Sequence, residues 1–285
     1  MVAALASATS WKLDPIQLAP ALLLAWGYWF RRRELVRRGR RVSRLRALSF
    51  YAGVAVIVLA VTSPIDTVGE ERLFWVHMVQ HLLLGDVAPL LIVLGLTGAL
   101  LRPLLAPRAM RPLRGLLHPG VALPVWAVNL YIWHLPALYE AALRHPVVHA
   151  LEHTLFIAAG AAMWAAVVEP LPGPAWFGTG WKAAYTLAVR AIQTGLANVF
   201  LWASVGFYDF YAAGERLSGL SARDDQAIAG GIMLLEGAVV TLLVFAWLFL
   251  RWTRESELRQ QLLDAGHDPA RSARAARYGR SPLGG

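Results

Sequence analysis

Long, uninterrupted apolar runs separated by shorter polar segments dominate this chain. Continuous apolar runs indicate membrane helices, whereas strands of a membrane barrel would alternate apolar and polar residues. A helix needs about 20 apolar residues to cross a bilayer. The pattern therefore predicts an all-α integral membrane bundle of about seven transmembrane helices, at residues 15–30, 47–62, 73–100, 120–138, 147–168, 184–205 and 227–250.

Composition supports the lipid bilayer as the surrounding solvent. Of 285 residues, 57% are hydrophobic and 16% are charged, with a mean hydropathy of +0.49. A soluble domain carries about 25% charged residues. The chain has no cysteine, which excludes disulfides, thiolate metal sites and iron–sulfur clusters.

Basic residues sort between alternate polar segments. Segment 31–46 carries nine arginines, 102–115 four, 169–183 one lysine, and the part from Arg251 onward seven arginines, which together make 21 of the 27 Lys and Arg. Basic loops remain in the cytoplasm. The pattern predicts the N-terminus outside and a membrane domain over 1–250, followed by a basic, partly disordered cytoplasmic tail over 251–285. A nucleic-acid partner is not expected, because the arginines flank the spans.

Two histidine pairs carry the candidate chemistry. "HMVQH" at 77–81 and "HALEH" at 149–153 each place two imidazoles four residues apart, on one face of a helix. With the predicted topology, both pairs and His134 fall at the outer side of the membrane. Interfacial histidines bonded to water are the plain alternative, but two such pairs favour a shared metal site.

That site is predicted to comprise His77, His81, His134, His149 and His153, together with Glu152. Five imidazoles exceed what one four-coordinate ion takes, so some orient the others or two ions lie close together. "HALEH" also fits the H-x-x-E-H pattern of zinc peptidases, in which Glu152 would act as the general base. We expect it to ligate or orient rather than to catalyse.

Two longer stretches carry a family resemblance. HMVQHLLLGDVAPLLIVLGLTGALLRPL and IWHLPALYEAALRHPVVHALEHTLFIAAGAAMWAAVVEP resemble signatures of the CtaG family of polytopic cytochrome c oxidase assembly factors. SPID before them and DDQAIAGGIM after them also resemble family patterns. The resemblance covers roughly residues 45 to 250.

The resemblance implies a multi-pass protein of the bacterial plasma membrane that is needed to make active haem–copper oxidase. It implies no enzymatic turnover, cytochrome c oxidase subunits as partners and a possible copper donor protein. Imidazoles suit copper and also zinc, and Met78 and Met233 could add thioether contacts to copper(I). A haem-binding redox protein and a membrane zinc hydrolase remain as alternatives.

Charged and polar side chains also occur within the predicted spans. Asp86, Arg190 and Glu236 would each be costly there without a partner. Asp86 and Arg190 are expected to pair with each other or with solvent and to hold helices together, with proton or ion conduction as the alternative. Glu236 is expected to orient a ligand histidine or to make a hydrogen bond between helices.

Overall fold

The computed structural model describes residues 11–105, 111–211 and 219–278, and every regular element in these ranges is a helix. By length and apolar composition, four helical segments could cross a membrane: Arg44–Thr62, Phe74–Gly95, Pro146–Val168 and Ala222–Asp264. The number is five if Pro119–Trp133 and Pro136–Arg144, which meet at 73°, form one span. The all-helical membrane class is confirmed, and seven spans stay a prediction.

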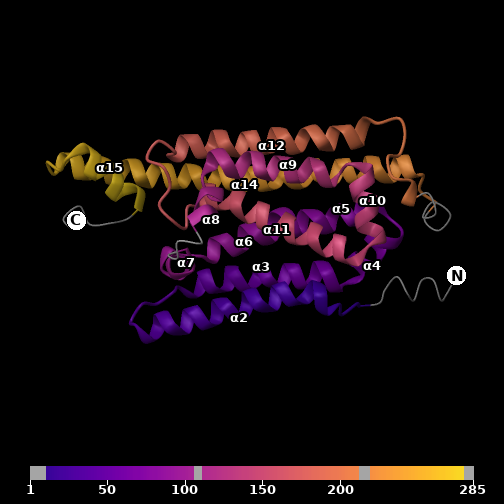
Figure 1. Ribbon diagram of the computed structural model, residues 1–285. Coiled ribbons are helices and arrows are strands. Elements are labelled where there is room, and N and C mark those ends of the chain that lie inside the picture. Colours follow the sequence, from indigo (N-terminus) through magenta and orange to yellow (C-terminus); the bar gives the residue numbers. More distant parts are fainter. Residues whose placement is uncertain (1–10, 106–110, 212–218, 279–285) are drawn as a thin grey trace.

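The long helices run lengthwise beside one another (Figure 1). They are α2 (Pro15–Arg37), α3 (Arg44–Thr62), the rod of α5 (Phe74–Leu82), η1 (Leu83–Val87) and α6 (Ala88–Gly95), α9 (Pro119–Trp133), α11 (Pro146–Val168), α12 (Thr179–Trp202) and α14 (Ala222–Asp264). Short helices cover the ends. The 3-10 turn η3 (Asp209–Tyr211), α4 (Pro64–Glu71) and α10 (Pro136–Arg144) lie at one end, and α7 (Gly98–Leu105), α8 (Arg111–Leu116) and α15 (Pro269–Tyr278) at the other.

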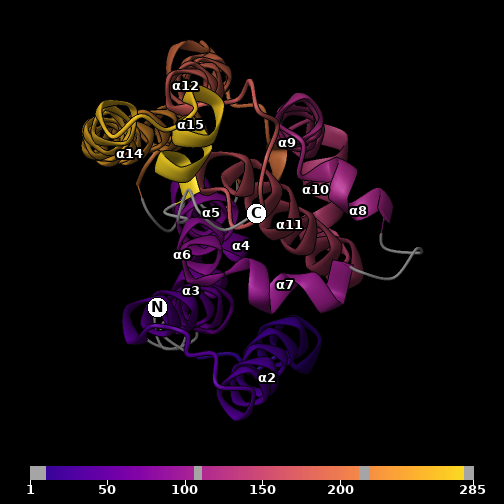
Figure 2. The same ribbon diagram turned by 90° about the vertical axis from the view of Figure 1, so that its left-hand side faces the viewer.

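Seen along the bundle, α5 and α11 lie in the middle (Figure 2). One hydrophobic core joins them to α9, α12 and α14, and a second core lies between α2, α3 and the α5–α6 rod. The middle position matters for function, because both histidine pairs are on α5 and α11.

The third predicted span, 73–100, is shorter and less regular than its apolar pattern indicates. The rod ends at Gly95, where Leu96 turns to an extended backbone, and residues 83–87 form a π-helix. Pro89 explains the irregular turn, because a proline ring clashes with the carbonyl four residues before it, here that of Gly85. A π-helical turn accommodates that misfit, and such turns are common at functional sites.

Further boundaries differ from the sequence prediction. Helix α2 continues to Arg37 and not only to about residue 30, and α12 begins at Thr179 and not near 184. The span expected over 120–138 ends at Trp133, where His134 leaves the helix and Pro136 begins α10. The last helix does not stop at residue 250 but continues to Asp264, and α15 follows it. Residues 279–285, the end of the predicted tail, lie outside the described part of the chain.

One buried carboxylate ties α15 to the bundle. Glu169 ends α11 with a left-handed backbone (φ 62°) and is 3% exposed at its side chain. It accepts hydrogen bonds from Arg277 at 2.7 Å, Lys182 at 2.6 Å and Tyr278 at 2.8 Å. Burial alone would raise the pKa of Glu169, but Lys182 and Arg277 outweigh it and lower that pKa. The carboxylate therefore stays charged and binds the tail.

Replacing Arg277 by alanine is expected to release α15, since breaking a buried ion pair leaves an uncompensated charge. Chymotrypsin cleavage after Tyr278 in detergent-solubilised protein measures the release, and we expect it to accelerate at least about tenfold. Arg274→Ala, an exposed arginine on the same helix, is the control. Equal cleavage rates in the two variants would contradict the anchoring role of Glu169.

Candidate metal centre

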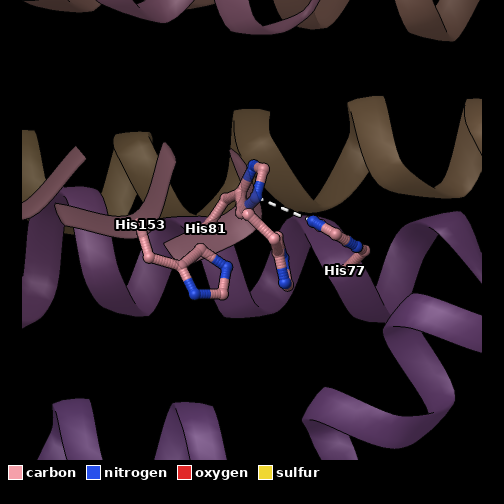
Figure 3. Close-up of side chains that lie close together, drawn as sticks. His77, His81 and His153 are labelled. Atoms are coloured by element: carbon pink, nitrogen blue, oxygen red, sulfur yellow. Dashed lines mark hydrogen bonds between the residues drawn. The ribbon is translucent and has the colours of Figure 1, made fainter. Parts of the chain in front are cut away.

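The two histidine pairs meet in the middle of the bundle. One ring nitrogen from each of His77, His81, His149 and His153 lies within 4.8 Å of the other three, and all four residues are buried. Figure 3 shows the rings of His77, His81 and His153 gathered between their helices. The described part of the chain thus forms a four-imidazole cluster from α5 and α11, as the spacing of the pairs allows.

The pair on α5 is nearly in coordination geometry. His77 Nε2 lies 2.7 Å from His81 Nε2, so one proton is shared between two ring nitrogens. Nitrogens that bind one tetrahedral ion at about 2.0–2.1 Å lie roughly 3.3 Å apart. A metal could therefore replace the shared proton after the rings move apart by only about half an ångström.

Hydrogen bonds fix the ring of His77. Tyr211 donates its hydroxyl proton to the Gly69 carbonyl at 2.9 Å, so that hydroxyl must accept from His77 Nδ1 at 3.3 Å. The proton on Nδ1 leaves Nε2 with its lone pair directed into the cluster. A donor interaction at the outer nitrogen is how proteins orient histidine ligands and make them more basic.

His149 is oriented by a carboxylate that the sequence reading did not single out. Its Nδ1 lies 2.8 Å from Glu70 Oε1 on α4, and its buried Nε2 has no hydrogen-bond partner among the described residues. Burial alone would raise the pKa of Glu70, but the hydrogen bond from His149 and the charge of Lys12 lower it. Burial and the charge of Glu70 raise the pKa of neighbouring Asp66 to about 7.

His134 lies beside the cluster but is not among the four nitrogens. Its ring centre is 5.8 Å from that of His81, and its Nδ1 lies 2.6 Å from the Leu130 carbonyl. A carbonyl only accepts, so Nδ1 carries the proton and Nε2 holds a lone pair. Within the described chain that Nε2 is buried and without a partner.

Glu152 supplies a buried carboxylate. The side chain is 0% exposed, and neither oxygen has a hydrogen-bond partner in the described structure. Its Oε1 lies 3.7 Å from Nε2 of His81, on the opposite helix. An isolated buried carboxylate is very costly unless it is neutralised, paired or bound to a metal. This position is therefore suited to balance the charge of a cation.

Other polar side chains hold α5 in place. The helix has no side-chain cap of its own, but Asp225 on α14 accepts from the backbone N–H groups of Phe74 and Trp75 at 2.8 and 2.9 Å. Gln80 donates to Asp66 at 2.8 Å and to the Ala60 carbonyl at 2.9 Å. These bonds hold the start of α5 and the side chain of Gln80, and so position the helix that carries His77 and His81.

The size of the site favours a small ion. Haem would need a flat cavity for its macrocycle between axial histidines, whereas the four nitrogens crowd within 4.8 Å and the adjoining cavity measures about 40 Å³. The four histidines and Glu152 are each at most 5% exposed, which suits a buried ion better than a peptide substrate. His145 and His118 lie elsewhere, at helix starts.

The fold and the site together define a polytopic helical membrane protein with an internal histidine cluster. A family model described as cytochrome c oxidase caa3 assembly factor matches residues 26–255. The chain belongs to this caa3 assembly factor (CtaG) family, as its two histidine-containing stretches predict. The match begins at residue 26 and not near 45, so it includes the basic segment 31–46 that the resemblance left out, and it ends at 255, close to the expected residue 250.

Relatives in mycobacteria are similar over most of this chain. An uncharacterized protein of Mycobacterium bovis and one of Mycobacterium tuberculosis are each 26% identical over 267 residues, covering 87% of this chain. One of Mycobacterium leprae is 26% identical over 266 residues. The chain spans about 40% of the length of these relatives. No solved structure matches.

Replacing His77 or His153 by alanine is expected to weaken Co²⁺ and Cu²⁺ binding by the purified protein at least about tenfold, because each supplies a nitrogen to the cluster. Equilibrium dialysis with metal analysis measures the loss. His145→Ala is the matched control, since His145 is exposed and makes no cap hydrogen bond. Undiminished binding by both cluster variants would show that these histidines are not ligands.

Proposed function

We propose that the protein binds copper as cargo at His77, His81, His149 and His153 and provides it during maturation of a haem–copper cytochrome c oxidase. One observation carries the proposal: four buried imidazoles converge beside Glu152, a buried carboxylate with no hydrogen-bond partner in the described chain. Its family membership supplies the connection to oxidase assembly. Oxidase subunits in the same membrane would receive the ion, and a copper donor protein could load it.

Copper is favoured over zinc by the ligand chemistry and by the family. An all-nitrogen site binds copper(II) more tightly than other divalent first-row ions, whereas imidazoles alone do not reject zinc. Thiolate exchange is not open to a chain without cysteine. Histidines would thus act as the exchanging ligands, with Glu70 and Tyr211 orienting them.

The cluster is proposed to open toward the outside of a bacterial plasma membrane crossed seven times. The arginine-rich segment 31–46 joins α2 to α3 at the end of the bundle where α7, α8 and α15 lie. The two histidine pairs occur in the first half of the α5–α6 rod and of α11, which both begin at the end near α4 and α10. This separation supports the positive-inside orientation.

Reporter fusions test the orientation. With a reporter active only in the cytoplasm, fusion at the C-terminus is expected to give signal and fusion at the N-terminus none, because basic segments resist translocation. A reporter active only outside the membrane should give the reverse and serves as the control. Signal from an external reporter at the C-terminus would place the histidine pairs at the cytoplasmic side instead.

Deletion of the gene in a host whose oxidase depends on it is expected to leave oxidase polypeptides present but oxidase activity and oxidase copper content low. The wild-type chain should restore both, His145→Ala should restore both, and His77→Ala should restore neither. Immunoblotting, oxygen consumption and metal analysis of the purified oxidase give the three readings. Normal copper content in the deletion strain would refute a role in copper supply.

A further inference from the structure

A small cavity adjoins the histidine cluster on its inner side. It measures about 40 Å³ and is lined by His81, His134, Met78, Met233, Asp86 and Gln193, with aliphatic and aromatic side chains completing the wall. A single water needs about 10–15 Å³ by the same measure. The cavity is therefore large enough for one ion but too small for an organic ligand of any size.

Two methionines from separate helices line this cavity. Met78 is on α5 and Met233 on α14, and they are 1% and 2% exposed. Met78 and His81 are three residues apart and so share a helix face. Thioethers are soft ligands that select copper(I) over the harder divalent ions. Methionine often fills gaps in a core, but here both side chains border an unfilled space beside histidines.

Two imidazole nitrogens complete the set. His134 Nε2 holds a lone pair, because the ring proton is on Nδ1, which donates a hydrogen bond to the Leu130 carbonyl. This Nε2 is buried and has no hydrogen-bond partner among the described residues. The Nδ1 of His81 is likewise buried and without a hydrogen-bond partner there, while the Nε2 of His81 faces His77. Within the described chain, the ring of His81 thus lies between the four-histidine cluster and the cavity.

We infer that this cavity is a second metal position, selective for copper(I), formed by Met78, Met233, His134 and His81. It deepens the proposed function, on which it rests, by naming the oxidation state of the cargo and its inner ligands. His81 belongs to both positions. A copper(I) ion can therefore pass between them by exchange of ligands, with no electron transferred, while the proton of the His81 ring moves to the nitrogen that the ion leaves.

The charges around the cavity favour a cation. The Asp86 carboxyl lines it and accepts a hydrogen bond from Trp164 at 2.5 Å, which fixes its direction. The guanidinium of Arg190 donates instead to the backbone carbonyls of Met233 and Leu234, on α14. Gln193 donates to Glu236 at 3.1 Å. Asp86 and Glu236 both interact with the positive charge of Arg190, and the Asp86 carboxyl is the one that would face a cation in the cavity.

The test uses the full chain in detergent, with anaerobic copper(I) titrated against a chromophoric chelator and silver(I) as a redox-inert probe. Met78→Leu combined with Met233→Leu nearly conserves core volume. We expect it to weaken copper(I) and silver(I) binding at least about tenfold and to remove sulfur from the copper X-ray absorption spectrum. Cobalt(II) binding at the four-histidine cluster should not change.

Met163→Leu is the matched control, because Met163 is equally buried but lies on α11 outside the cavity lining. His134→Ala should reproduce the loss of copper(I) affinity while leaving cobalt(II) binding intact. A wild-type spectrum without sulfur, or copper(I) affinity unchanged in the double variant, would overturn the inner position alone. A wild-type chain that bound neither cobalt(II) nor copper(I) would refute the proposed function as well.

Discussion

The close approach of α11 to the α5–α6 rod is the constraint on which the histidine cluster depends. A Cβ atom on Gly160 would lie 2.0 Å from the carbonyl oxygen of Gly85, so only glycine lets the two backbones meet there. Small residues at such crossings are a general means of packing membrane helices. At this crossing distance the imidazoles of one helix reach those of the other. A larger residue at position 160 would move the histidine pair on α11 away from the pair on α5.

The same crossing explains what the sequence could predict of the fold and what it could not. Hydrophobic runs located the long helices to within a few residues, because burial in lipid or core demands an apolar surface along their whole length. They did not reveal the π-helical turn before Pro89, since an apolar run indicates where a helix lies but not the hydrogen-bond pattern of its backbone. Nor did they indicate that α14 continues to Asp264, because its polar end packs against α15 and not in an apolar environment.

The site was predictable one helix at a time. Spacing of four residues gave each pair its common face, and the inward direction of both faces follows from the cost of polar groups in lipid. Which residues orient the rings was not accessible, because Glu70, Tyr211 and Asp225 are distant in sequence from the groups they contact. Asp225 lies in a stretch that resembles the family. Only the structure shows that this side chain, on α14, accepts hydrogen bonds from the first turn of α5.

The same charge balance applies to the four-histidine cluster and to the inner cavity. Four neutral imidazoles add no charge, and Lys12 at 3.6 Å offsets the charge of Glu70 beside His149. The ionised Glu152 would therefore offset a bound ion within the cluster. A monovalent ion would then leave the site neutral, whereas a divalent ion would leave one uncompensated positive charge in a medium of low dielectric constant. The inner cavity follows the same rule, with soft neutral ligands and the Asp86 carboxyl at its wall. A copper(I) ion would thus have one carboxyl group to balance its charge at either position.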